Sequence, residues 1–309
     1  MRLRTLTALL AAALVILVST SSCGNTSTPT GDASLTVVAS LSFTADMAQN
    51  VAGDRVHVTS LVPLDTDPHA FEPSPSDLQE VAAADIVILN GGGLEGQLEK
   101  ALQSAGGDAT IVYASQGLAS RTPQPGEPEL DEDGVDPHFW LDPQLGIKYV
   151  ENIAAALSAV DPEGADTYAA NAQAYIKQLE AVDEEIRARV ATIPEEQRKL
   201  IMNHASHGYY ADAYGFTVVG TVIPSVSTGE SPSAQQLTAL TEAIKKNHVR
   251  AIFVELGEDP TLARQIAAET GIEVVDDLLD HSLTEPGGVA PTYIDLLRYD
   301  TERIVGALQ

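Results

Sequence analysis

The chain has 309 residues, of which 44 are Asp or Glu and 17 are Lys or Arg, so its formal net charge at pH 7 is −27. A surface this acidic repels nucleic acid and anionic membranes, which argues against nucleic acid as a partner. The length is sufficient for two medium-sized domains.

The first 22 residues have the pattern of a secretory signal. Two arginines precede an apolar run at residues 9–18, which is too short to span a bilayer, and small polar residues then lead to Cys23. Cys23 is the only cysteine, so no disulfide can form within the chain. Its position resembles a lipoprotein cleavage site, although Thr20 stands where leucine is usual; the alternative is an ordinary signal with an incidental cysteine. We predict a signal peptide at 1–22, lipidation of Cys23, a linker at 23–34 and anchoring to the outer face of the cell membrane.

After the linker, short β-branched runs alternate with helical patterns, which indicates βα units and mainly parallel sheets. The predicted strands form two similar sets: 35–40, 56–62, 86–90 and 110–114, then 199–204, 216–223, 251–256 and 273–277. We therefore predict an α/β fold with two similar lobes, at residues 35–160 and 192–309.

A long helix is predicted between the lobes, at residues 161–191. Apolar residues recur there at three- and four-residue steps from Tyr168 to Val190, and Asp161 before Pro162 fits an N-cap with proline at the first helical position. A helix of this length can run along both lobes as a rigid bridge.

Two segments interrupt this order. Residues 121–136 are rich in acids, Pro and Gly without apolar periodicity, so we predict an exposed, mobile loop of the first lobe. Residues 91–96 match a glycine-rich nucleotide-binding pattern, but no acid stands where a ribose would need it, so a tight strand-to-helix turn is expected.

Three histidines stand in loops or at strand ends, where α/β proteins place ligands. His69 and His138 each follow an Asp-Pro pair, and His204 ends a predicted strand. A proline before a histidine stiffens the turn that carries it. Imidazoles and a carboxylate converging from separate loops are typical of a tetrahedral zinc shell, so we predict a metal site between the lobes.

The spacing of the histidines excludes the HExxH pattern of zinc proteases. One enzyme class stays open, a zinc-dependent hydrolase in which Glu72 or Asp142 activates water. In a closed shell the same two acids would instead accept hydrogen bonds from metal-bound imidazoles, because such rings usually donate their second N–H to a carboxylate.

With these motifs in order, the chain resembles the zinc and manganese ABC-importer solute-binding proteins. The resemblance extends over almost all of residues 35–308. The segments that match its motifs are residues 53–55, 67–77, 90–95, 136–143, 204–216, 227–237, 251–255 and 291–293. The resemblance implies two lobes bridged by one rigid helix, and no enzyme activity. It also implies that His69, His138 and His204 are three of four metal ligands.

The resemblance leaves the fourth ligand open between two neighbours. Counting back from Pro291 gives His281 without a gap and Asp280 with a gap of one residue. A carboxylate neutralises a partly buried zinc better than a fourth imidazole, so Asp280 is favoured.

The resemblance further implies a cargo and partners. A histidine at position 204 is associated with zinc-preferring members, which agrees with the preference of zinc for imidazole; Mn²⁺ is the alternative cargo. The implied partner is the permease of an ABC importer, with a zinc metallochaperone as a further candidate. The chain is expected to be monomeric, and a role as a manganese-binding adhesin is a second alternative.

Overall fold

A computed structural model describes residues 35–105, 108–130 and 134–309. The predicted signal peptide, Cys23 and the predicted linker at residues 23–34 lie outside these ranges. Within them, no helix combines the length and apolarity needed to cross a membrane.

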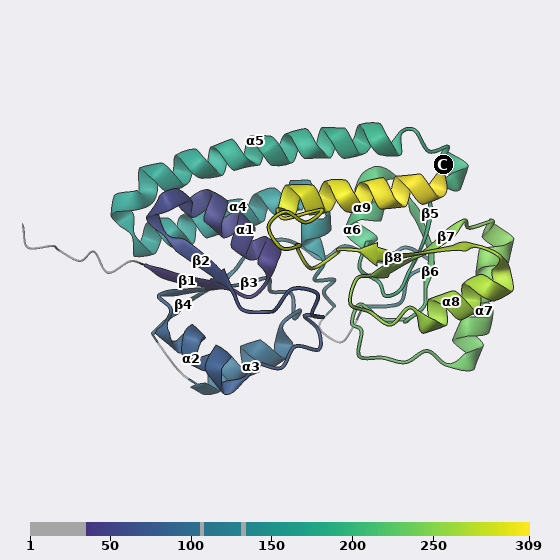
Figure 1. Ribbon diagram of the computed structural model, residues 1–309, viewed down its shortest axis with the longest axis horizontal. Coiled ribbons are helices and arrows are strands. Elements are labelled where there is room, and N and C mark those ends of the chain that lie inside the picture. Colours follow the sequence, from purple (N-terminus) through teal and green to yellow (C-terminus); the bar gives the residue numbers. More distant parts are fainter. Residues whose placement is uncertain (1–34, 106–107, 131–133) are drawn as a thin grey trace, which may run out of the picture. The chain divides into compact units, whose positions relative to one another are not determined.

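The first lobe is built on a four-stranded parallel sheet in the order β2-β1-β3-β4 (Figure 1). Its strands are β1 (Thr36–Ala39), β2 (His57–Ser60), β3 (Ile86–Leu89) and β4 (Thr110–Tyr113). Its helices are α1 (Ser42–Ala52), α2 (Pro75–Ala83), α3 (Gly96–Ala105) and α4 (Pro143–Val160), with 3-10 turns at Gly53–Arg55 and Phe139–Leu141. Side chains alternate along each strand, so both faces of the sheet are covered: Ile86 and Ile88 pack in one core cluster, and Val87 and Leu89 in another.

The second lobe repeats this architecture with the strand order β6-β5-β7-β8. Its strands are β5 (Lys199–Met202), β6 (Thr217–Thr221), β7 (Ala251–Glu255) and β8 (Glu273–Leu278). Its helices are α6 (Gly208–Tyr214), α7 (Ala234–Asn247), α8 (Thr261–Thr270) and α9 (Tyr293–Leu308), with a 3-10 turn at Glu195–Gln197. The predicted fold class is confirmed, and each of the eight predicted strands has a counterpart. In both sheets the strand order reverses beside the first strand of the lobe, where α/β folds bind ligands.

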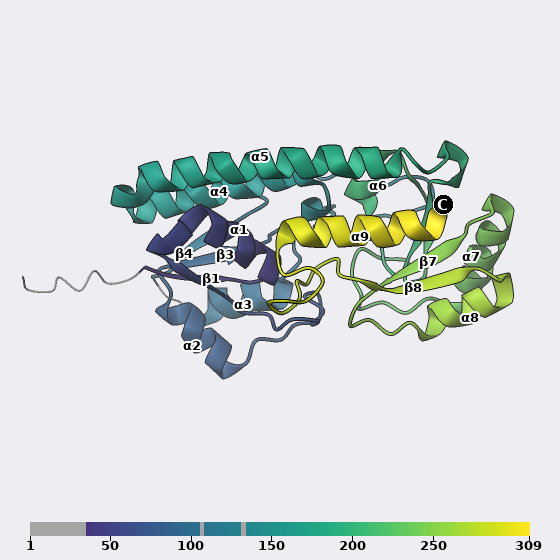
Figure 2. The same cartoon turned by 45° about the horizontal axis from the view of Figure 1, so that its top comes forward.

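The long helix α5 (Ala165–Val190) follows a 3-10 turn at Pro162–Gly164. Asp161 caps that turn by accepting a hydrogen bond from the Gly164 N–H, as predicted. The 26 residues of α5 extend about 39 Å at 1.5 Å per residue. The helix packs on α1 and α4 of the first lobe and on α6 and α9 of the second (Figure 2).

One large hydrophobic core extends through both lobes, and each lobe also has a smaller cluster of its own. A single cluster of buried side chains includes Val37 of β1, Leu179 of α5 and Leu200 of β5. Trp140 and Tyr293 lie in the same cluster, and the Tyr293 hydroxyl donates to the Trp140 carbonyl. The described residues accordingly form one compact unit. A shared core opposes wide movement of one lobe against the other.

One prediction about the fold was wrong. Residues 121–130 are not an exposed loop of the first lobe, because they pack against the second lobe, where Arg121 and Glu127 have side-chain exposures of 5% and 3%. Gln124 hydrogen-bonds to Phe216 and Val218 of the second lobe. The polar residues that suggested solvent exposure are used in this contact.

Candidate metal centre

Three imidazoles converge between the two lobes. His69 lies in the loop after β2, His138 stands just before the turn at Phe139–Leu141, and His204 lies two residues after β5. The Nε2 atom of His138 is 3.4 Å from that of His69 and 3.3 Å from that of His204. Tetrahedral coordination with Zn–N bonds of 2.0–2.1 Å separates two ligand nitrogens by about 3.3 Å. The structure therefore brings the three predicted histidines to the spacing of a zinc shell.

The first two histidines are held by the same local turn. In each Asp-Pro-His segment the Asp Oδ1 accepts a hydrogen bond from the backbone N–H of the His, at 2.9 Å for Asp67 and His69 and 3.1 Å for Asp136 and His138. Such Asx turns are local and form without tertiary contacts, and the intervening proline restricts the backbone further. Both rings are thus set in place by the sequence around them.

A side chain at the end of β3 supports the turn of His138. The Asn90 amide donates to the Pro137 carbonyl at 3.0 Å and accepts a hydrogen bond from the Tyr149 hydroxyl at 2.6 Å. Asn90 and Tyr149 are both fully buried. The turn that carries His138 is therefore fixed to the core of the first lobe.

Carboxylates contact the outer nitrogen of two rings. Asp136 Oδ1 lies 2.9 Å from His138 Nδ1, and Glu255 Oε1 lies 3.2 Å from His204 Nδ1. A carboxylate that accepts from Nδ1–H leaves the Nε2 lone pair free for a metal, and Asp136 is placed to do so. The contact of Glu255 with His204 is an ion-pair distance without hydrogen-bond geometry, and Glu255 Oε1 accepts from the Ser206 hydroxyl at 3.1 Å. Sequence reasoning did not name either acid. Asp136 could have been found from its motif, and Glu255 from its place at the end of a fully buried strand.

The two acids named from the sequence lie elsewhere. Glu72 is exposed, and Asp142 accepts a hydrogen bond from the Gln144 N–H at 2.8 Å as the N-cap of α4. Among the described residues, neither acid hydrogen-bonds to a histidine ring. Asp142 is occupied because the Asp-Pro pair that begins α4 needs its carboxylate as a cap.

The protonation states of the rings suit cation binding. Burial, together with His138 and His204, holds the pKa of His69 well below its ordinary value. Burial alone would lower the pKa of His204, but the nearby acids, Glu255 first among them and then Asp280 and Glu258, together raise it to about 9. In the metal-free protein at neutral pH, His204 therefore carries a proton that a metal would replace.

Asp280 lies on the second-lobe side of the centre. It groups with His204 and Glu255 within 4.8 Å, but not with His69 and His138. Both of its carboxylate oxygens are buried and have no hydrogen-bond partner. Nearby histidines hold its pKa below the ordinary value although burial would raise it. A buried carboxylate that accepts no hydrogen bond is stabilised by a cation, so Asp280 suits a metal ligand.

The backbone of Asp280 is fixed from both lobes. Its N–H donates to Asp300 of α9 at 2.9 Å, and its carbonyl accepts from the Trp140 indole of the first lobe at 2.8 Å. Its φ of 46° is in the left-handed region, which few residues other than glycine adopt. The alternative ligand His281 is also buried; its Nδ1 lies 3.7 Å from Asp280 Oδ2, and its Nε2 has no partner.

A small cavity of about 190 Å³ has His69 in its wall. His69 is only half-buried, whereas His138 and His204 are buried. The glycine turn at residues 91–93 forms part of the cavity wall and has φ angles between 67° and 86°. Glu95 closes this turn by accepting hydrogen bonds from the Asn90 and Gly91 N–H groups at 2.6 and 3.2 Å. The glycine-rich segment is thus a tight turn, as predicted.

Comparison with known proteins identifies the family of this chain. The model of the family described as "zinc-uptake complex component A periplasmic" matches residues 37–307. The chain belongs to this family. Members of this zinc-uptake family are substrate-binding proteins of metal ABC transporters and not enzymes, so the hydrolase alternative is set aside.

The proteins that this chain resembles are named for different metals. The manganese-binding lipoprotein MntA of Halalkalibacterium halodurans is 33% identical over 96% of both chains. The metal ABC transporter substrate-binding lipoprotein ScbA of Streptococcus cristatus is 32% identical over 91% of both. Among solved structures, the periplasmic zinc-binding protein TroA of Treponema pallidum has a TM-score of 0.80 and 26% identity, covering 89% of this chain and 99% of that one. A manganese-bound periplasmic protein of Candidatus Liberibacter asiaticus has a TM-score of 0.76 and 27% identity, covering 89% and 100%.

Proposed function

We propose that this protein captures Zn²⁺ between its lobes and delivers it to the permease of an ABC importer. His69, His138 and His204 would bind the ion through Nε2, with Asp280 as the fourth ligand. The observation that carries the proposal is the spacing of the Nε2 atoms, 3.3 and 3.4 Å, which matches a tetrahedral zinc shell. A closed shell of four protein ligands suits carriage, since catalytic zinc keeps an open position.

The charge of the centre supports the choice of Asp280. The carboxylates of Asp280 and Glu255 together would balance one divalent cation, while Asp136 lies 3.7 Å from Arg121. Four imidazole ligands would leave more uncompensated positive charge in a buried place. A shift of Asp280 toward His69 and His138 would complete the shell.

Manganese is the second candidate cargo. Carboxylate oxygens suit Mn²⁺, and Asp280 and Glu255 both lie close to His204. The relative MntA is named for manganese binding. Three imidazoles still favour zinc, because Mn²⁺ prefers oxygen ligands and a larger coordination number.

Titration of the metal-free protein with Zn²⁺ and with Mn²⁺ tests the proposal. We expect one Zn²⁺ per chain and a weaker, slower-saturating response to Mn²⁺. Because zinc binds most nitrogen and oxygen sites more tightly than manganese, the visible spectrum of the Co²⁺-substituted protein should be recorded as well. An intense four-coordinate spectrum supports the zinc shell, and a weak six-coordinate spectrum would contradict it.

The fourth ligand is tested by Asp280→Ala and His281→Ala in the same titration. We expect Asp280→Ala to weaken zinc binding and His281→Ala to bind almost as the parent does. The reverse result would assign the fourth position to His281.

The proposal places the protein outside the cytoplasm, anchored through a lipid on Cys23. Several relatives are named lipoproteins, which supports this location. Labelling of cells with a radioactive fatty acid, for the parent and for Cys23→Ala, tests it. Labelling of both proteins, or of neither, would contradict lipidation at Cys23.

A further inference from the structure

Arg121 lies at the junction of the two lobes, close to the metal centre. Its guanidinium donates to both oxygens of Glu127 at 2.8 and 2.7 Å and to both oxygens of Asp212 at 2.7 and 3.2 Å. It also lies 3.7 Å from Asp136 Oδ2. Arg121 belongs to the segment that follows β4, and Asp212 belongs to α6 of the second lobe. One buried cation thus joins three carboxylates from both lobes.

Residues 121–130, which we name the cross-lobe strap, dock on the edge of the second sheet. The Gln124 amide donates to the Phe216 carbonyl at 3.2 Å and accepts from the Val218 N–H at 3.1 Å. Because β6 is an edge strand, these are backbone groups that no neighbouring strand pairs. Gly126 approaches so closely that a Cβ there would lie 2.1 Å from the Val218 oxygen. The strap therefore follows β6 with little room for adjustment.

A second glycine, Gly208, lies in close contact with the Arg121 guanidinium. At Gly208, the first residue of α6, a Cβ would lie 2.2 Å from Arg121 Nη1. The helix α6 begins four residues after His204. The Arg121 guanidinium thus packs against the segment that follows His204. It also contacts Asp136, the acid beside His138.

Asp136 connects the strap to the metal centre. Its Oδ1 lies 2.9 Å from His138 Nδ1, while its Oδ2 lies 3.7 Å from Arg121 Nη1. Its carbonyl accepts from the Tyr209 hydroxyl at 3.0 Å, and that hydroxyl also accepts from the Arg121 N–H at 3.3 Å. In the part of the chain that the structure describes, Arg121 is the only Lys or Arg within 4 Å of this buried carboxylate. Without it, Asp136 would be left as a buried charge with no cation, which is unfavourable.

We propose that Arg121 is a positioning residue for His138, so that the affinity for the metal depends on docking of the cross-lobe strap onto the second lobe. The proposal rests on the proposed function, because it requires His138 to be a ligand. Arg121 lies against Asp136 Oδ2 and so keeps the other carboxylate oxygen, Oδ1, directed at His138 Nδ1. This arrangement keeps the Nε2 lone pair of His138 directed at the metal. Loss of a carboxylate that orients a metal-bound histidine typically reduces affinity about 10- to 100-fold, and Arg121 acts through that carboxylate.

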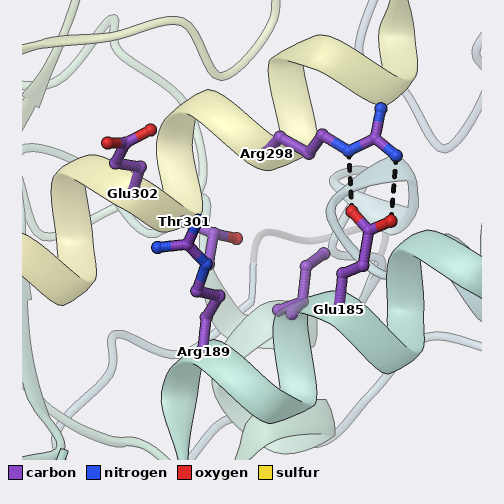
Figure 3. A pocket seen from close by; sticks show the side chains of 6 residues that line it. Glu185, Arg189, Arg298, Thr301 and Glu302 are labelled. Atoms are coloured by element: carbon purple, nitrogen blue, oxygen red, sulfur yellow. Dashed lines mark hydrogen bonds and ion pairs between the residues drawn. The ribbon is translucent and has the colours of Figure 1, made fainter. Parts of the chain in front are cut away.

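The test compares zinc affinity in the full chain carrying Arg121→Met with a matched control. Arg298→Met is the control, because Arg298 forms a two-bond ion pair with Glu185 at 2.7 and 3.1 Å that joins α9 to α5 (Figure 3). That pair lines a separate cavity of about 240 Å³. We expect Arg121→Met to weaken zinc binding about 10-fold or more and Arg298→Met to leave it unchanged.

A double-mutant cycle separates positioning from general destabilisation. In the Asp136→Asn background, Arg121→Met should cause little further loss of affinity, because the acid through which it acts has lost its charge. In the metal-loaded parent, the NMR signal of the His138 Nδ1–H should be visible, and it should shift in Arg121→Met. A purely structural role would give additive losses and an unshifted signal, which would overturn the proposal.

The remaining outcomes are also decisive. If the parent does not bind zinc, the proposed function fails. If the parent binds zinc and Arg121→Met binds it equally well, only the positioning role of Arg121 fails. Should Arg121→Met not fold, Arg121→Gln, whose amide can still donate to Glu127, is judged by the same criteria.

Discussion

Glu255→Gln tests how the second lobe controls the proton on His204. In the metal-free protein the pKa of His204 is raised to about 9, because the nearby acids, of which Glu255 contributes most, together outweigh the effect of burial. At pH 7 the ring is therefore protonated, and a metal ion must displace that proton at a cost on the order of 3 kcal/mol, or about 100-fold in affinity. Glutamine keeps the shape of the side chain but removes its charge, so the pKa of His204 should fall.

The affinity and the stability of the parent should respond to pH in opposite directions. Zinc affinity should rise about tenfold per pH unit between pH 7 and 9, as His204 loses its proton. The folded-state pKa of His204 lies above its unfolded value, so its contribution to stability is complete below about pH 6.5 and is lost as the pH rises through about 9. That contribution is on the order of 3 kcal/mol.

Isothermal titration calorimetry in buffers of different ionisation enthalpy counts the protons released per zinc bound. At pH 7 the parent should release about one proton more than Glu255→Gln. Glu269→Gln is the control, because Glu269 pairs with Lys245 on the surface, and it should match the parent. Equal proton release by the parent and Glu255→Gln would show that Glu255 does not hold a proton on His204, and the reasoning would be refuted.

Three further substitutions separate the metal centre from its scaffold. Trp140→Phe removes the hydrogen bond to the Asp280 carbonyl, so it should destabilise the fold by about 1–3 kcal/mol and weaken zinc binding. Thermal unfolding and zinc titration check this, and unchanged values in both would contradict a role of Trp140 in holding the Asp280 backbone. Asp142→Ala removes the N-cap of α4 and should cost about 1 kcal/mol of stability, while zinc affinity stays at the parental value. A large loss of zinc affinity would instead support the prediction that Asp142 accepts a hydrogen bond from a metal-bound histidine. Tyr149→Phe leaves Asn90 Oδ1 without a hydrogen-bond partner in the core, and the free energy of unfolding measured with denaturant should fall by about 1–3 kcal/mol. An unchanged free energy of unfolding would contradict this prediction.

Much of the fold could be predicted from the sequence because its signals are local. Strands such as Ile86–Leu89 are continuous apolar runs, and α5 shows a regular apolar repeat. The Asp-Pro-His turns are local as well, since each Asp bonds to a backbone two residues away. The positions of His69 and His138 at the ends of such turns could therefore be inferred before any tertiary contact was known.

The cross-lobe strap shows where local reasoning failed. Its acids and prolines are typical of exposed loops, yet Arg121 and Glu127 are buried in contact with the second lobe. The partners that make this burial favourable, Asp212 and the edge of β6, are about 90 residues away in the sequence. No local pattern contains that information.

The sequence by itself determined the two βα lobes, the bridging helix and the three histidines that converge between the lobes, because strand order, helix periodicity and short turns depend on neighbouring residues. Only the tertiary structure decided that Asp136 and Glu255 contact the outer nitrogens of two rings and that Asp280 lies beside His204 without a hydrogen-bond partner. These roles depend on which charges share a buried space. Burial makes an unpaired charge costly, so the choice of partner is set by distances across the fold and not by spacing along the chain.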